Sequence, residues 1–99
     1  MVRKALLVRM EARQGKEDEA AKFLTSALPL VTEESKTIAW FGIRIGTSGF
    51  GIFDAFPNEE ARLTHLHGKV AAALMARAPE LFTGAPVIEH VEILAAKLP

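Results

Sequence analysis

Two spacings of apolar residues alternate along this chain, and their order restricts the folds that it can adopt. A two-residue period, typical of a strand with one buried face, predicts strands over 4–12, 37–45, 50–56 and 87–94. A three- to four-residue period predicts amphipathic helices over 16–31 and 58–78. The order βαββαβ is that of the α+β ferredoxin-like motif, a four-stranded antiparallel sheet with both helices on one face.

Turn-forming residues agree with these boundaries. The segment Gly46-Thr47-Ser48-Gly49 predicts a short hairpin between the second and third strands. Asn58 is a candidate cap for the second helix, and Pro79 is expected to end it. Pro29 lies inside the first helix and predicts a kink near Thr25.

Composition excludes several classes of protein. Apolar residues make up 49% of the 99 residues, and 12 basic residues balance 12 acidic ones, which argues against disorder and against a basic nucleic-acid-binding domain. The absence of cysteine excludes a disulfide scaffold and thiolate chemistry. The first apolar stretch stops at Arg9, too short for a signal peptide, so we expect a single cytoplasmic domain over residues 1–99.

The alternation within each strand predicts which residues share a face of the sheet. The set expected to pack under the helices is almost wholly apolar: Leu6, Val8, Met10, Ala39, Phe41, Ile43, Ile45, Phe53, Ala55, Val87, Val91 and Ile93. The set expected on the opposite face mixes aromatic and charged residues: Leu7, Arg9, Glu11, Ile38, Trp40, Arg44, Phe50, Ile52, Asp54, Phe56, Ile88, His90 and Glu92.

Because both helices lie on one side, the mixed face would be bare in a monomer. Its large apolar residues would form a patch beyond what monomers usually expose: Leu7, Trp40, Phe50, Ile52 and Phe56. We therefore expect a homodimer in which this face meets that of a second copy, and in which charged residues pair inside or at the rim: Arg9, Arg44, Asp54, His90 and Glu92. A chain terminus or a different partner is the alternative cover.

Two segments carry a resemblance to a known family. They are FGIFDAFPNEEARLTHLHG, over 50–68, and PVIEHVEILAAK, over 86–97. With Glu60-Ala61 and His65-Leu66 on the second helix, the chain resembles the antibiotic biosynthesis monooxygenases, small dimeric α+β barrels, along nearly its whole length. The resemblance implies oxygenation of a small aromatic or quinol substrate by O₂ without metal, flavin or haem. Other members of the family modify quinols or degrade haem.

Such a reaction requires a general base and donors that hold the developing charge of the substrate. On a helical wheel His67 lies about 40° from Leu63, inside the apolar stripe, whereas His65 lies about 200° away. This geometry favours His67 as the base, while the family pattern favours His65. Trp40 and Arg44 are the candidates for orienting the substrate, and His65 and Asp54 are further, less favoured candidates for a catalytic role.

Each candidate also has a structural interpretation. His67 could be a buried histidine bonded to a carbonyl, Trp40 a dimer anchor, and Arg44 or Arg9 part of an ion pair across the sheet. His65 and His67 point to different helix faces, so no metal site is expected. Strand one lacks the asparagine found in haem-degrading members, which argues against that reaction. A non-catalytic ligand-binding or stress-response dimer remains an alternative, and a lactone isomerase or related lyase rests on fold analogy alone.

Overall fold

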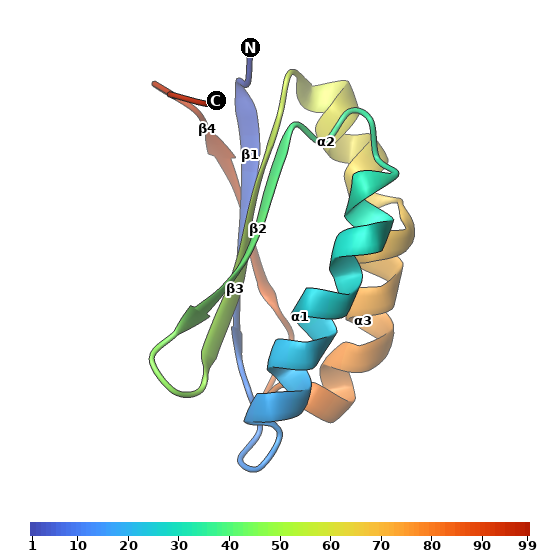
Figure 1. Ribbon diagram of the computed structural model, residues 1–99, viewed down its shortest axis with the longest axis vertical. Coiled ribbons are helices and arrows are strands. Elements are labelled where there is room, and N and C mark those ends of the chain that lie inside the picture. Colours follow the sequence, from blue (N-terminus) through green and yellow to red (C-terminus); the bar gives the residue numbers. More distant parts are fainter.

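The computed structural model describes residues 1–99 and confirms the predicted ferredoxin-like α+β fold (Figure 1). The elements are β1 (Lys4–Glu11), α1 (Glu17–Thr32), β2 (Ala39–Ile45), β3 (Gly49–Phe56), α2 (Glu59–Leu66), α3 (Lys69–Leu81) and β4 (Val87–Glu92). The strands form one antiparallel sheet in the order β2-β3-β1-β4. No helix combines the length and the apolar character required to cross a membrane.

All three helices lie on one side of the sheet, with α1 and α3 next to each other (Figure 1). The main core fills the space between these two helices and the sheet. Its largest members come from every layer: Met10, Phe23, Leu24, Phe50, Ile52, Leu74, Leu81 and Phe82. The opposite side of the sheet carries no helix (Figure 1).

The predicted second helix is divided into α2 and α3. Asn58 caps α2 as expected, since its side chain accepts a hydrogen bond from the backbone N–H of Ala61 at 2.9 Å. The break falls at Gly68, whose extended backbone begins α3. Both helical prolines are accommodated near helix ends: α1 continues past Pro29 to Thr32, and α3 continues past Pro79 to Leu81. The Pro79 prediction of a helix end is therefore wrong by two residues.

The predicted faces of the sheet are wrong for three of the four strands. In the register, Leu6, Val8 and Met10 lie opposite Asp54, Ile52 and Phe50, and residues directly opposite each other share a face. The set on the helix side of β2, β3 and β4 is therefore the one expected on the bare side: Trp40, Arg44, Phe50, Ile52, Asp54, Phe56, Ile88, His90 and Glu92. The odd-numbered residues of β3 are apolar and the even-numbered ones are apolar except for Asp54, so alternation alone could not choose between its two faces.

The bare face is consequently more apolar than predicted. Of the large apolar residues predicted to form a patch on the bare face, only Leu7 lies there. Other apolar residues are exposed on this face instead: Phe41, Ile43, Ile45 and Val87. Of the charged residues expected there only Arg9 and Glu11 remain, and Arg9 pairs with Glu89 at 3.7 Å. The sheet thus presents an apolar surface with its charged pair at one side.

Candidate functional site

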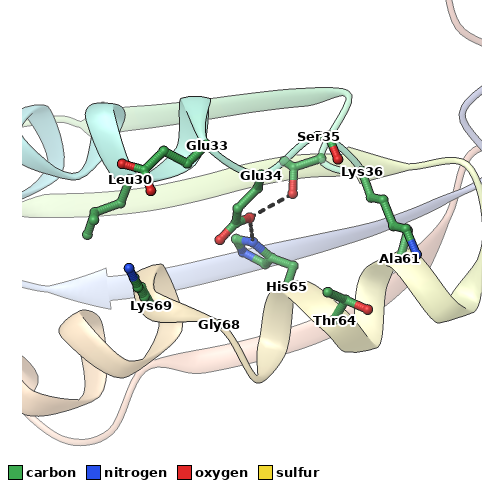
Figure 2. A pocket seen from close by; sticks show the side chains of 11 residues that line it. Leu30, Glu33, Glu34, Ser35, Lys36, Ala61, Thr64, His65, Gly68 and Lys69 are labelled. Carbon is green, nitrogen blue, oxygen red and sulfur yellow. Dashed lines mark hydrogen bonds and ion pairs between the residues drawn. The ribbon is translucent and has the colours of Figure 1, made fainter.

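His65 on α2 is buried between two carboxylates that come from distant parts of the chain. Figure 2 shows it beside one of them, Glu34. Its Nδ1 lies 2.5 Å from Oε1 of Glu34, in the loop between α1 and β2. Its Nε2 lies 2.9 Å from Oδ2 of Asp54, a β3 residue that is only 1% exposed. One imidazole therefore joins helix α2, the sheet and the loop after α1.

The protonation of His65 follows from these contacts. A neutral imidazole has one donor, so it could satisfy only one of the two carboxylates, whereas an imidazolium donates to both. Burial of the ring acts to lower the pKa of His65, but the hydrogen bonds and charges of Asp54 and Glu34 outweigh it and raise this pKa above the usual value of 6.5. The two carboxylates therefore favour protonation of the His65 imidazole relative to a free histidine.

Local packing fixes the orientation of the ring and of Glu34. The ring of Phe56 lies 5.3 Å from the imidazole, centroid to centroid. The hydroxyl of Thr37 donates to Oε1 of Glu34 at 2.8 Å. Gly68 leaves room for the carboxylate, since a Cβ at this position would lie 3.3 Å from Oε2 of Glu34. The helix break at Gly68 thus contributes directly to the geometry of the site.

A polar cleft of about 340 Å³ opens beside this cluster, between the loop after α1 and the junction of α2 with α3 (Figure 2). Lys36, Thr64 and Lys69 lie along it together with Glu34 and His65. Asp54 does not line this cleft, so Glu34 and His65 separate the buried carboxylate from the solvent.

A second cleft of about 350 Å³ lies between α1 and β2 and is largely apolar. Its walls are formed by Leu24, Leu28, Trp40, Ile43 and Phe50, together with Ala21, Thr25, Gly42 and Arg44. The Trp40 ring lies beside Gly42, where a Cβ would come within 3.2 Å of Cη2 of the indole. The structure therefore brings the two predicted substrate-orienting residues, Trp40 and Arg44, into one cleft.

Trp40 and Asp54 connect the apolar cleft with the charged cluster. They lie directly opposite each other on β2 and β3, on the helix side of the sheet. The indole Nε1 of Trp40 and Oδ1 of Asp54 are buried polar atoms without a partner within the protein. Asp54 Oδ2 has the ion-pair contact with His65, while Oδ1 has neither kind of partner.

The prediction that His67 faces the sheet is wrong, because His67 is exposed at the end of α2. The helical wheel was aligned on Leu63, which is itself 45% exposed, and the break at Gly68 separates Leu63 from the buried stripe of α3. The inward face of α2 is formed by Ala61, Arg62 and His65. The histidine that the family pattern favours is therefore the buried one.

The expected ion pairs of Arg44 are also absent. Its guanidinium donates to the carbonyl of Thr47 at 2.8 Å and lies 5.1 Å from the centroid of the Phe50 ring. His90 is exposed on the edge strand, and Glu92 pairs with Lys4 at 3.5 Å. Sequence reasoning missed Glu34 altogether, since nothing in a polar loop marks which of its carboxylates will fold against a helix.

Comparison with known proteins yields structural relatives only. No family model and no curated protein matches the sequence. A solved structure, the NE2512 protein of unknown function from Nitrosomonas europaea, is 56% identical and superimposes with a TM-score of 0.97 over 100% of this chain and 96% of that one.

More distant structures share the fold. A "putative antibiotic biosynthesis monooxygenase" from Caulobacter crescentus is 17% identical, with a TM-score of 0.79 over 95% of this chain and 92% of its own. A protein of the same description from Chloroflexus aurantiacus is 12% identical, with a TM-score of 0.74 over 96% of each chain. The predicted resemblance is confirmed at the level of the fold.

Proposed function

Because the chain belongs to the family of the NE2512 protein and has the α+β-barrel fold of antibiotic biosynthesis monooxygenase-like proteins, we propose that it is a cofactor-independent monooxygenase. Its substrate would be a small aromatic compound or a quinol, bound in the apolar cleft between α1 and β2. Oxygenation without a cofactor requires the substrate to be deprotonated to an anion that itself reduces O₂. One oxygen atom then enters the product, and the other leaves as water.

The observation that carries this proposal is the buried array Asp54–His65–Glu34 beside Trp40. Asp54 is a carboxylate with a free oxygen in an apolar layer, which is the arrangement of a general base. The His65 imidazolium holds Asp54 in place, and Glu34 connects the imidazole with the polar cleft. We assign the role of base to Asp54 with His65, in place of His67.

Trp40 and the apolar walls of the cleft would hold the ring of the substrate. Leu24 and Leu28 from α1 form the wall opposite Trp40 from β2. Arg44 is engaged with Thr47 and Phe50, so it would contribute the positive potential of its guanidinium at the cleft rather than a fixed ion pair.

A second function is favoured by one feature of the same cleft. The guanidinium of Arg44 already donates to the Thr47 carbonyl, so it is less available to bind an anion. The mostly apolar lining of the cleft therefore suits an apolar ligand better than an anion. The protein would then hold a small apolar ligand without turnover. Stabilisation against heat by aromatic compounds that are recovered unchanged would support this alternative.

The bare face of the sheet supports a homodimer. Phe41, Ile43, Ile45 and Val87 are exposed there, and one copy of the chain has no element to cover them. A second copy with the same surface would bury both patches, as isologous interfaces do. We propose that the dimer interface lies on this face, where Ile43 also borders the apolar cleft.

The direct test is O₂ consumption with a panel of quinols and polyphenols, followed by mass spectrometry of products formed under ¹⁸O₂. We expect the wild type to incorporate one labelled oxygen atom, and Asp54→Asn to lose about 100-fold or more of the rate, as removal of a general base does. His67→Ala is the matched control, because this exposed histidine lies outside both clefts, and it should keep the full rate. No uptake with any substrate, or an unchanged rate in Asp54→Asn, would contradict the proposal.

A further inference from the structure

The apolar cleft extends to the outer edge of the sheet, where it meets the bare face. Ile43 lies on β2, which has β3 as its only neighbour in the sheet. On the bare face it lies against Gly51 directly opposite, since a Cβ on that glycine would be 3.3 Å from Cγ1 of Ile43. Ile43 also lines the cleft between α1 and β2, on the other side of the sheet. At this residue, therefore, no further strand separates the cleft from the bare face.

The wall of the cleft is incomplete on this side. The residues that line it come from α1, from β2 and, in Phe50, from β3. Gly42 is exposed there and has no side chain, and Leu28 of α1 is 51% exposed although it lines the cleft. An apolar ligand bound in one copy of the chain would keep part of its surface in water, and that part would not contribute to binding.

The bare face favours a second copy of the chain as the body that closes this side. Phe41, Ile43 and Ile45 are exposed along β2, so this margin of the face is a continuous apolar surface. Arg9 and Glu89 lie on the same face, 3.7 Å apart and of opposite charge. In a twofold interface a surface meets itself. The apolar rows then cover each other and each basic group can approach an acidic group of the other copy, whereas a partner of one charge would repel one of the two.

We propose that a second copy of this chain, docked on the bare face, closes the open side of the apolar cleft, so that the ligand site is complete only in the dimer. The inference rests on the proposed function for the place of the ligand and on the proposed dimer, and it adds a coupling between the two. By thermodynamic linkage, each bound ligand strengthens the dimer by the factor by which dimerisation strengthens the binding of that ligand. The fraction of complete sites then depends on the concentration of the protein.

The test measures both sides of this coupling with 1-naphthol, a small aromatic compound, as the probe. Its affinity is measured by calorimetry under nitrogen, so that no turnover occurs. The dissociation constant of the wild-type dimer is measured by analytical ultracentrifugation with and without saturating 1-naphthol. We expect a coupling of about tenfold for each site, within the usual range for two linked sites, and so a decrease of about 100-fold in the dimer dissociation constant when both sites are filled.

Two variants separate the partner from the cleft. Phe41 lies on the bare face and lines neither cleft, and Met75 on α3 has the same exposure, 53%. Phe41→Asp, which should be a monomer, is expected to bind 1-naphthol about tenfold more weakly than the wild-type dimer does. Met75→Asp should remain a dimer with the affinity of wild type. Circular dichroism reports the folding of each variant, and the ultracentrifugation of wild type needs no variant.

Equal affinities of a folded Phe41→Asp monomer and of Met75→Asp would overturn the inference, as would a dimer dissociation constant that 1-naphthol leaves unchanged. A wild-type protein that stays monomeric with the ligand bound would also overturn it and leave a different partner as the cover of the face. Absence of 1-naphthol binding would overturn it by removing the site. The proposed function fails separately: coupling without O₂ consumption retains the dimeric site and removes the oxygenase, whereas O₂ consumption by the Phe41→Asp monomer at the wild-type rate does the opposite.

Discussion

The carboxylate of Asp54 lies 2.9 Å from Nε2 of His65, and the two side chains are 1% and 6% exposed. An ion pair this deeply buried is costly to desolvate and is stable only when its other polar atoms are satisfied. Glu34 satisfies the second nitrogen of the imidazole. The free oxygen of Asp54 faces no partner of its own, which sets this pair apart from a purely structural ion pair.

The contribution of His65 to stability should depend on pH. Its pKa is raised in the folded protein above the ordinary value of 6.5, so the stabilisation is complete below about pH 6.5 and is lost as the pH rises through the folded-state pKa. Urea unfolding of wild type and His65→Gln should show a larger difference at pH 6 than at pH 9. His67→Gln, a change at an exposed position, should show no such dependence. A difference that grows with pH would contradict the assignment of a charged imidazole.

Arg62 should stabilise the fold more than its partner Glu59 does. Its guanidinium is buried, pairs with Glu59, and donates to the carbonyls of Ala5 and Val91 at 3.0 and 3.2 Å, so it joins α2 to β1 and β4. Arg62→Met would remove both of these hydrogen bonds and the ion pair with Glu59, and we expect a loss of about 1–3 kcal/mol in the free energy of unfolding. Glu59→Gln should have a smaller effect, because Glu59 reaches the solvent. Equal losses in urea unfolding would contradict this division.

Gly42 should control the position of the tryptophan. A Cβ at this residue would lie 3.2 Å from Cη2 of Trp40 and 3.4 Å from Cβ of Leu24, so Gly42→Ala should displace the ring and narrow the apolar cleft. We expect a shift of the tryptophan emission spectrum, because the indole would move relative to the side chains around it. Gly68→Ala is the comparison, since its Cβ would meet Glu34 rather than Trp40. The same emission spectrum in Gly42→Ala and wild type would show that the ring is not constrained there.

A charge on the bare face of the sheet should separate the two copies of the proposed dimer. Phe41 on that face and Met75 on α3 are each 53% exposed, which makes them a matched pair. We expect Phe41→Asp to shift the mass measured by light scattering from that of a dimer to that of a monomer, while Met75→Asp leaves it unchanged. A wild-type protein that is a monomer at micromolar concentration would contradict the dimer itself.

The element order could be predicted from sequence because each strand and helix has its own period, and periods are local. The face of the sheet on which each residue lies could not be predicted in this way. It depends on whether the odd- or the even-numbered residues of β3 share a face with the even-numbered residues of β1. In β3 the odd- and the even-numbered residues are both mainly apolar, so neither strand alone indicates that Val8 pairs with Ile52. Trp40 and Asp54 carry polar groups and lie on the helix side. Their presence there favoured the wrong prediction that this face is not covered by the helices.

The candidate site was predictable only in part for a related reason. The orientation of His65 depends on where α2 ends, and Gly68 ends it without any proline or polar run. The family resemblance favours His65, and this is the histidine of α2 that is buried, whereas the helical wheel favours the exposed His67. Glu34 approaches His65 through the path of the loop after α1, which no local period encodes.

The imidazole of His65 also attaches the loop that connects α1 to β2, through its contact with Glu34. That loop is otherwise held by few bonds, among them Thr37 N–H to Glu34 and Ile38 N–H to Ala55. Loss of the proton from His65 removes one charge from the centre of two ion pairs and so weakens the attachment of Glu34. Amide hydrogen exchange in this segment should therefore follow the same titration as the contact between His65 and Asp54, so local opening of the loop would be linked to the position of the proposed base.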